Sequence, residues 1–368
     1  SDVYKRQILK MKIYQIRSKC KFKSKNKNSK YLNDKNKINC KFINGKVRNM
    51  ELPILLKEKL EQEIDEIELK KLKQSAQNIS EKYRDKSSNK MSTRLIASRE
   101  DAVAYAVSRM PATYGAVCFA LKHSLEMMPC AEITSLLDVG AGTGTATWAV
   151  NEMLKIESNI CVENEDYMLN LGQKLMKNEI DNVQWIKKNI ITDNIEEKAD
   201  LVISSYVLNE IKSENRNQIL EKLWNSTGKL LLIIEPGTPE GYNQIKEIRD
   251  YFIKKGANIV APCAHEKKCK ISKNDWCAFS CRVARTKVHK LLKEGEAPYE
   301  DEKFSYIAVS KMKTDKKDRI LRHPKIENGR ITLKLCTIEG DIEEKIITKK
   351  EKEKFKIAKK LNNGDILK

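Results

Sequence analysis

The sequence lacks any long apolar run. No stretch approaches the eighteen or more consecutive apolar residues that a membrane-spanning helix needs. The first 49 residues also lack the apolar core of a secretory signal peptide, and they are rich in Lys and Asn where transit peptides are rich in Arg. We therefore expect a protein without a membrane partner.

Negative charge is scarce at the start of the chain. Residues 1–49 hold sixteen Lys and Arg against two Asp, a net charge of +14 out of +20 for the whole chain. The remaining residues therefore carry only +6, so the overall basicity is weak support for a nucleic-acid partner. Residues 1–49 also have little apolar content and no periodicity, which predicts a disordered leader. Its opening, SDVYKRQ, resembles translated sequencing adapter, so the leader need not be native, and we expect the fold to begin at Met50.

Cysteine pairs of the C-x2-C type, typical of structural zinc sites, are missing, although the chain holds ten cysteines. Without a secretion signal, so many cysteines indicate free thiols or metal ligands in a reducing compartment, not a disulfide framework. A cytoplasmic location is the expectation from composition.

Helices are predicted before residue 131. Apolar residues recur at three- and four-residue spacing from Leu56 to Tyr83, which predicts one long amphipathic helix packed on the core. Ser98, with Asp101 three residues later, resembles a capping box and predicts a helix that begins there and ends at Pro111. A further helix is expected to run from there to about Met128.

From Ile133 onward, short apolar runs alternate with amphipathic segments. This alternation predicts a parallel sheet with helices on both faces. The predicted strands are ITSLLDV, NICVE, VQWIKK, ADLVISS and KLLLIIE, followed by ANIVAP and FSYIAVS. After about Lys313, GRITLKLCTIEG and DIEEKIITKK predict a hairpin or a small barrel fragment.

Four regions are expected from these patterns. They are the leader at 1–49, an N-terminal helical region at 50–130, an α/β domain at 131–312 with a cysteine-rich insert at 261–285, and a C-terminal β-rich segment at 313–368.

A glycine-rich loop follows the first predicted strand and opens a helix. It reads Asp138-Val-Gly140-Ala-Gly142-Thr-Gly144. Glycines there let the backbone approach a ligand closely, and the helix start offers unpaired N–H groups. Dinucleotide sites read G-x-G-x-x-G, whereas this spacing resembles motif I of class I methyltransferases, whose loop holds the methionine part of S-adenosylmethionine. The resemblance implies a class I methyltransferase Rossmann-like fold.

Glu163 ends the second predicted strand, 19 residues after Gly144. An acidic residue at this place accepts hydrogen bonds from both ribose hydroxyls of a nucleotide. The candidate cofactor-binding residues are therefore those of the loop and the two strand ends: Asp138, Gly140, Gly142, Gly144, Glu163 and Ser204.

Catalytic signatures are missing around this loop. The fourth strand ends Ser204-Ser205-Tyr206-Val-Leu-Asn209-Glu210, with neither an Asn-Pro-Pro-aromatic motif nor a catalytic cysteine. No proton acceptor or nucleophile is assigned. The turn at 235–239, EPGTP, either lines a substrate cleft or is only a tight turn.

Four cysteines, Cys263, Cys269, Cys277 and Cys281, lie within nineteen residues. Clustered thiolates bind zinc or hold an iron–sulfur cluster, and the missing C-x2-C pairs favour the cluster. His265 is the candidate fourth ligand of an alternative zinc site with three cysteines. The aromatic residues Trp276 and Phe279 are expected to shield a cluster from water.

Several further blocks match one family in order. They are YAVSRMPATYGAV (105–117), LLDVGAGTGTATWA (136–149), EPGTPEGY (235–242), APCAHEKKC (261–269), DWCAF (275–279), YEDEKFSYIAVSK (299–311), and RILRHP with LCTIEG (319–339). Over roughly residues 50–368 the chain resembles the ribosomal small subunit protein 22 family, whose mitochondrial members assist small-ribosomal-subunit assembly or translation. The resemblance implies S-adenosylmethionine binding, contact with small-subunit rRNA, a [4Fe–4S] site, and the mitochondrial matrix as location in a eukaryote. We expect a monomer off the ribosome.

The resemblance changes the ligand set of the cysteine site. The family's ligands match Cys263, Cys269, Cys277 and the distant Cys336, whereas Cys281 stands at a usually polar position. Proximity in the sequence alone favours Cys281. A ligand at Cys336 would clamp the C-terminal β segment to the insert. Departures from the family at Ala264, Lys270 and Ala278 remove no ligand.

Two functions of different classes remain open. An S-adenosylmethionine-dependent rRNA methyltransferase needs turnover, and the intact loop with Glu163 favours it. A non-catalytic assembly factor needs only binding, and the missing catalytic signature favours that. Basic residues around the cysteines either contact phosphates and bases together with Trp276 or form a solvated face. They are Lys267, Lys268, Lys270, Lys273, Arg282, Arg285 and Lys287.

Overall fold

The structure is a computed structural model, and it describes residues 50–84, 96–292 and 296–367. The expectation of a disordered leader at 1–49 lies outside these residues. No helix in the described part of the chain is long and apolar enough to cross a membrane.

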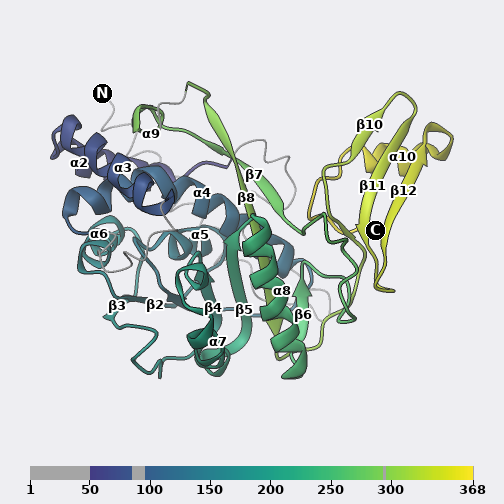
Figure 1. The fold of residues 1–368 in the computed structure, drawn as a ribbon, viewed down its shortest axis with the longest axis horizontal. Coiled ribbons are helices and arrows are strands. Elements are labelled where there is room, and N and C mark those ends of the chain that lie inside the picture. The colour runs from purple at the N-terminus through teal and green to yellow at the C-terminus, as the bar shows by residue number, and fades with distance from the viewer. Residues whose placement is uncertain (1–49, 85–95, 293–295, 368) are drawn as a thin grey trace, which may run out of the picture. The chain divides into compact units, whose positions relative to one another are not determined.

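The main sheet contains every strand predicted between residues 133 and 310. Its path is β3-β2-β1-β4-β5-β8-β6, and β7 pairs with β8 at the side (Figure 1). The strands are β1 (Ser135–Val139), β2 (Ser158–Glu163), β3 (Val183–Lys187), β4 (Ala199–Ser205), β5 (Thr227–Pro236), β6 (Asn258–Ala261), β7 (Phe279–Ala284) and β8 (Tyr299–Ser310).

The direction of the strands identifies the fold. β1 to β5 pair in parallel, in the 3-2-1-4-5 order of a doubly wound sheet. β8 runs antiparallel between β5 and β6. This order confirms the predicted class I methyltransferase Rossmann-like fold.

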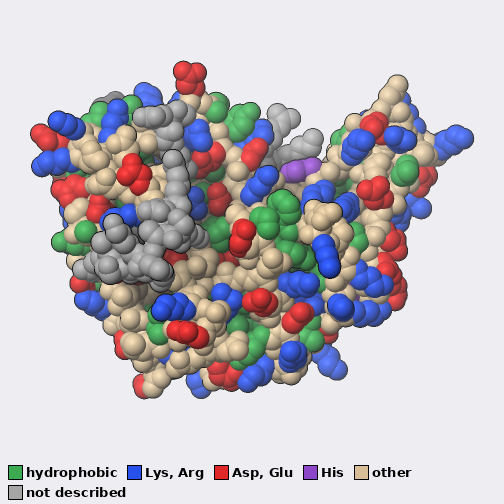
Figure 2. Space-filling model, viewed as in Figure 1, with side chains coloured by type: hydrophobic (Ala, Val, Ile, Leu, Met, Phe, Trp, Pro, Cys, Tyr) green, Lys and Arg blue, Asp and Glu red, His purple; other side chains and the backbone are tan. Residues whose placement is uncertain are grey.

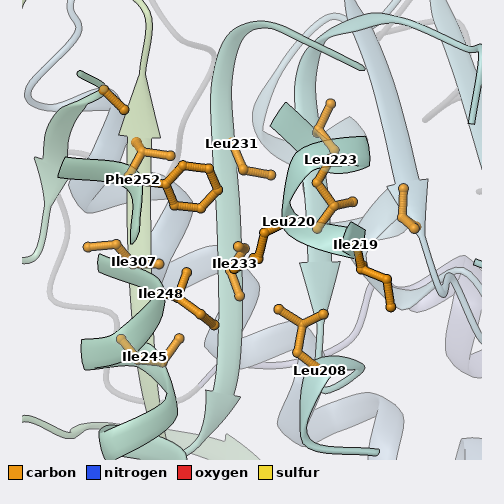
Figure 3. Close-up of a cluster of buried hydrophobic side chains, with 14 of the residues drawn as sticks. Leu208, Ile219, Leu220, Leu223, Leu231, Ile233, Ile245, Ile248, Phe252 and Ile307 are labelled. Atoms are coloured by element: carbon orange, nitrogen blue, oxygen red, sulfur yellow. The ribbon is translucent and has the colours of Figure 1, made fainter. Parts of the chain in front are cut away.

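Helices cover both faces of the sheet. η1 (Leu208–Glu210), α7 (Ser213–Ser226) and α8 (Pro239–Lys254) lie on one face, and α4 (Arg99–Leu125), α5 (Thr145–Met153) and α6 (Asp166–Met176) lie on the other (Figure 1). Figure 3 shows how Leu220 of α7 and Phe252 of α8 point at the β5 and β8 side chains Ile233 and Ile307. All four are buried, so this apolar layer fixes the sheet beneath the site.

The predicted long helix is wrong, because the chain turns between two helices. They are α2 (Ile54–Asp65) and α3 (Leu69–Arg84). The turn lets each helix bury its own apolar side chains, Leu56 and Leu60 from α2 and Leu72 from α3. Tertiary packing thus overrides a periodicity that continues through the turn.

The prediction that Pro111 ends a helix is also wrong. Ser98 does cap α4 as predicted, because its side chain accepts a hydrogen bond from the Asp101 N–H at 3.1 Å. The helix then continues through Pro111 to Leu125. Proline removes one helical hydrogen bond, but α4 buries most of its side chains on both sides of Pro111, and this packing offsets the loss.

A second sheet forms the C-terminal part of the described chain, as predicted. It contains β9 (Arg319–Ile320), β10 (Lys325–Glu327), β11 (Arg330–Cys336) and β12 (Ile342–Thr348), and β11 with β12 is the expected hairpin. Its apolar face packs on Phe355 of α10 (Lys352–Ala358), which follows η2 (Lys349–Glu351).

β7 and the start of the described chain meet beside β8. β7 was not predicted, because its alternation of buried Phe279, Cys281 and Val283 lies inside the cysteine-rich insert. α9 (Lys287–Leu292) follows it. The Met50 N–H donates to the Arg282 carbonyl at 2.7 Å, which attaches residue 50 to β7.

Candidate functional sites

The three glycines of the loop after β1 all have left-handed backbone conformations. Gly140, Gly142 and Gly144 have φ values of 71°, 57° and 78°. A Cβ at Gly140 would lie 2.4 Å from Val207 Cγ2, and one at Gly144 would lie 2.0 Å from Met176 Cε. At Gly142 the nearest atom would be Met168 Cε at 3.5 Å, so this glycine is not required by the packing around it. Of the three glycines, it is the one with free space beside its Cα, where a ligand could approach the backbone.

The start of α5 lies beside the loop and is capped only in part. Gly144 occupies the N-cap position and has no side chain, and the Asp138 carboxylate accepts from the N–H of Thr147, the third residue of the helix. The first N–H groups of a helix have no partner within it, and they attract carboxylates and phosphates. The structure thus places the loop and the helix start as the sequence predicts for a nucleotide site.

Asp138 is fully buried at the end of β1. Its Oδ2 accepts hydrogen bonds from the Thr147 N–H at 3.1 Å and from Thr147 Oγ1 at 2.9 Å. Its Oδ1 has no hydrogen-bond partner in the described residues. Burial raises the pKa of Asp138 to about 7, although the bonds from Thr147 oppose this shift. A buried carboxylate oxygen without a partner fits a donor supplied by a ligand.

Glu163 closes the loop from the end of β2. Its Oε2 accepts a hydrogen bond from the Gly142 N–H at 2.7 Å. Its Oε1 accepts from the N–H groups of Asn164 and Glu165 at 2.7 and 2.9 Å. Burial raises the pKa of Glu163 against these bonds. The carboxylate is therefore held beside the open glycine, where it can accept ribose hydroxyls.

Ser204 and the residues that follow it line the end of β4. Ser204 is buried, and its Oγ has no partner in the described residues. Tyr206 has a φ of 61°, which is rare for a residue with a side chain. Its hydroxyl donates to Glu302 Oε1 at 2.8 Å, and Arg109 lies over its ring. Strained residues of this kind gather at functional sites, and no pattern in the sequence predicts the left-handed backbone of Tyr206.

Glu235 organises the same rim and also escaped prediction as a site residue. It is buried at the end of β5, and its two oxygens accept from the N–H groups of Leu208 at 2.9 Å and Asn209 at 3.2 Å. Burial raises the pKa of Glu235 to about 8, against the effect of these two bonds. Glu235 therefore fixes the segment after β4 to the end of β5.

The EPGTP turn is tightly packed. A Cβ at Gly237 would lie 2.6 Å from the backbone of Lys303 and Phe304. Its carbonyl accepts from Trp276 Nε1 at 2.9 Å. This packing favours the tight-turn alternative, and it joins the turn to the cysteine insert.

The cysteine insert and the C-terminal sheet share one cavity. Four of the predicted ligands line it: Cys263, Cys269, Cys277 and Cys336. Cys336 comes from the end of β11, and the other three come from the insert. Burial raises the pKa of Cys336 to about 12 and raises that of Cys277. A thiol of this kind stays protonated unless a metal binds it.

Cys281 lies elsewhere. It is buried on β7 and faces α4, where a Cβ at Gly115 would lie 2.9 Å from its Sγ. It does not line the cavity. The structure therefore brings together the set implied by the family resemblance and not the set that is closest in the sequence.

The cavity carries polar atoms that suit a bound inorganic group. Tyr306 Oη and His265 Nδ1 are buried there without hydrogen-bond partners in the described residues. Tyr242 Oη lies 3.6 Å from Cys269 Sγ. Among residues 50–84, 96–292 and 296–367, no three His, Cys, Asp or Glu side chains are arranged to hold a single metal ion.

Aromatic shielding comes from residues other than those predicted. Tyr242 and Tyr306 line the cavity, whereas Trp276 and Phe279 do not. Trp276 instead donates a hydrogen bond to the Gly237 carbonyl of the EPGTP turn, and Phe279 is buried against Phe119 of α4. The tyrosines lie 35 residues before and 29 residues after Cys277 by residue number, on α8 and β8, so only the fold shows that they line the cavity.

Many of the basic residues around the insert are paired. Lys267 pairs with Glu339 and Lys270 with Asp341. Arg282 pairs with Asp301, and Arg285 pairs with Glu300. In the described chain, Lys268, Lys273 and Lys287 are the members of the predicted set without an ion pair, and all three are exposed.

Comparison with known proteins gives the family. The family described as mitochondrial small ribosomal subunit Rsm22 matches residues 99–368. The human protein named ribosome assembly protein METTL17, mitochondrial, is 25% identical over 285 residues, which cover 72% of this chain and 61% of that protein. The Rsm22-cox11 tandem protein 2, mitochondrial, of Schizosaccharomyces pombe is 24% identical over 214 residues, 45% of this chain and 28% of that protein. The chain thus spans less than two thirds of the length of either relative.

Solved methyltransferase structures share the fold only. The plantazolicin methyltransferase BpumL is 11% identical, with a TM-score of 0.38, and the match covers 67% of this chain and 98% of that one. The magnesium protoporphyrin IX methyltransferase of Synechocystis PCC 6803 is 10% identical, with a TM-score of 0.36, and covers 59% of this chain and 85% of that one. The family match covers well over half of the sequence, and the chain therefore belongs to the family described as mitochondrial small ribosomal subunit Rsm22.

Proposed function

We propose that the chain binds S-adenosylmethionine and acts on the small ribosomal subunit as a methyltransferase-like protein. The observation that carries this proposal is the site at the ends of β1 and β2. There the uncrowded Gly142, the start of α5 and the Glu163 carboxylate meet. The family and the human relative, which is named as a ribosome assembly protein, support the ribosomal partner.

The residues present fit this cofactor. Gly142 and the α5 start would face its methionine part, and Glu163 would accept its ribose hydroxyls. When bound, S-adenosylmethionine supplies an electrophilic methyl group. The chain's own contribution at the rim is Tyr206, which Glu302 and Arg109 hold in place beside Ser204. These groups would orient a nucleotide at the end of β4.

We propose methylation of small-subunit rRNA as the activity, with non-catalytic assembly as the alternative. The name of the human relative favours assembly, and the complete loop with Glu163 favours turnover. The relatives are named as mitochondrial, so we propose the mitochondrial matrix for a eukaryotic source and give up the expectation of the cytoplasm.

A [4Fe–4S] cluster on Cys263, Cys269, Cys277 and Cys336 is part of the proposal, with zinc as the alternative. Its support is the shared cavity and the partnerless Tyr306 Oη and His265 Nδ1. A cluster there would tie β11 to the insert. The exposed Lys268 and Lys273 of the insert are the candidates for contact with rRNA phosphates. Figure 2 shows many further Lys and Arg side chains around the C-terminal region.

The experiment combines crosslinking-and-sequencing of RNA bound to the chain with a methylation map of a strain that lacks its gene. We expect small-subunit rRNA in the crosslinks and one methylated nucleotide missing from the map. The missing methyl group should return with the wild-type gene and not with Glu163→Ala. The non-catalytic alternative would be established if the strain lacking the gene showed the same methylation map as the wild type and Glu163→Ala restored its subunit assembly.

A further inference from the structure

Two arginines are buried near the four cysteines: Arg249 lines their cavity, and Arg319 lies behind its wall, where its charge acts on Cys263. Arg249 of α8 is 3% exposed, and Arg319 of β9 is 1% exposed and is the largest of the fully buried side chains. A guanidinium group is charged at any relevant pH, and burying it is costly unless an opposite charge compensates it. The burial of these two charged groups therefore predicts a compensating anion nearby.

Arg319 touches the chain around two of the four cysteines. It lies opposite Cys336 in the β9–β11 pairing. Its Nε donates to the carbonyl of Pro262, the neighbour of Cys263, at 3.2 Å, and its Nη1 donates to the Gly364 carbonyl at 2.8 Å. No ion pair joins Arg319 to a carboxylate in the part of the chain that the structure describes. Its two hydrogen bonds go to carbonyl groups, and the Glu126 carboxylate, which His123 and Lys122 share, acts on its charge without an ion pair.

Arg249 holds the loop between Cys263 and Cys269. Its Nη2 donates to the carbonyls of His265 at 3.0 Å and Lys267 at 2.6 Å, and Arg249 lines the cavity itself. Its ion pair is with Asp250 at 2.9 Å, whose side chain is 50% exposed. Water screens a carboxylate of that kind, so it compensates the buried charge only in part.

We infer that Arg249 and Arg319 are the countercharges of a doubly negative metal centre formed by the four cysteines. An oxidised [4Fe–4S] core and a zinc ion each carry two positive charges, so four thiolates leave two negative charges in either case. Two guanidinium groups balance them. Without metal, no thiolates balance the two arginines, and Asp250 and Glu126 oppose their charges only in part, which destabilises the metal-free chain. The inference rests on the metal site of the proposed function.

The first test compares stability with and without metal. In anaerobically purified full-length chain, Arg319→Met should lower the unfolding temperature of the metal-loaded form. The same substitution should leave the metal-free form unchanged or more stable, because it removes a buried charge that is compensated only in part. A purely structural arginine would destabilise both forms alike. Arg285→Gln is the control, since Arg285 is paired with Glu300 at 2.9 Å away from the cavity, and it should not change the difference between the two forms.

The second test measures the effect of the arginine charges on the reduction potential of the cluster. Arg319→Met and Arg249→Gln should make the reduction potential of the cluster more negative, because the reduced cluster carries one more negative charge. Arg249→Lys keeps the charge and loses the paired carbonyl bonds, so it should keep the potential close to that of the wild type. If Arg319→Met does not fold, the comparison of Arg249→Lys with Arg249→Gln still tests the inference.

The outcomes distinguish a failure of the metal site from a failure of the countercharge role of the two arginines. A wild-type chain that holds neither iron nor zinc overturns the metal site and this inference together. A wild-type chain that holds metal, with equal destabilisation of both forms in Arg319→Met and an unchanged potential in Arg249→Gln, overturns the inference alone. A metal-loaded form weakened selectively in both variants supports it.

Discussion

Glu163 accepts a hydrogen bond from the backbone N–H of Gly142 at 2.7 Å, and this bond joins the end of β2 to the loop after β1. Its other oxygen is occupied by two backbone N–H groups of the next turn. One carboxylate thus shapes the loop and also faces the open glycine. Loop order and cofactor affinity should therefore change together when Glu163 is altered.

Replacing Glu163 by Ala should weaken S-adenosylmethionine binding by about 10- to 100-fold, the value of one or two hydrogen bonds to a charged group. Calorimetric titration of the purified chain measures this. Asp166→Asn is the matched control, because Asp166 is an exposed carboxylate three residues away that pairs with Lys187. An affinity reduced equally in both variants would contradict the assigned role.

The glycines of the loop should differ in their response. Gly142→Asn should fold and lose cofactor binding, since asparagine tolerates left-handed backbone and no neighbouring atom lies closer than 3.5 Å to its Cβ position. Gly140→Ala should destabilise the fold by a few kcal/mol, because its Cβ would overlap Val207. Thermal unfolding measures the stability of both variants, and calorimetric titration measures their affinity for the cofactor. Full affinity in Gly142→Asn would show that the cofactor lies elsewhere.

Cysteine substitutions should distinguish the two ligand sets. Cys336→Ser should lose the cluster, and Cys281→Ala should keep it, because only Cys336 lines the cavity. Wild-type chain purified without oxygen should contain about four iron atoms and four sulfides, as one cluster requires. Iron and sulfide analysis of the three proteins is the measurement. Iron retained in Cys336→Ser and lost in Cys281→Ala would restore the set that is closest in the sequence.

Stability should fall as the pH rises toward 8. The pKa of Glu235 is raised by burial to about 8 in the folded chain, from 4.5. The folded state therefore keeps a proton that the unfolded state has lost over this interval. The stabilisation is complete below about pH 4.5, and it is lost between there and about pH 8 at no more than ~1.4 kcal/mol per pH unit.

Glu235→Gln should flatten this dependence. Denaturant unfolding of ligand-free chain between pH 5 and 9 measures the slope in both proteins. The Asp138 carboxyl, with its pKa of about 7, should leave a smaller slope in the variant. Equal slopes in wild type and variant would show that Glu235 is already ionised in the folded chain.

Removing residues 1–49 should leave folding and cofactor affinity unchanged. This proposal rests on the change in composition at Met50. Removing three further residues should destabilise the chain, because the backbone of Met50 bonds Arg282 and Ala284 beside β7. Unfolding temperatures of the two shortened chains test the boundary. A large loss on removing 1–49 alone would place those residues in the fold.

Local patterns in the sequence determined the strands and the glycine loop. Apolar runs buried on both faces, such as 230–234 in β5, are read directly from residue type, because a parallel strand between two helical layers needs them. The loop from Asp138 to Gly144 is equally local, since backbone conformation there depends on the glycines themselves.

Only the tertiary structure decided which groups meet. Cys336 and Cys263 lie 73 residues apart in number and share a cavity, whereas the nearer Cys281 turns to α4 because β7 alternates its faces. The course of α4 through Pro111 was likewise set by burial. Distances between elements depend on packing that no short window of sequence contains, so the buried Arg319 beside Cys336 could be found only in the folded chain.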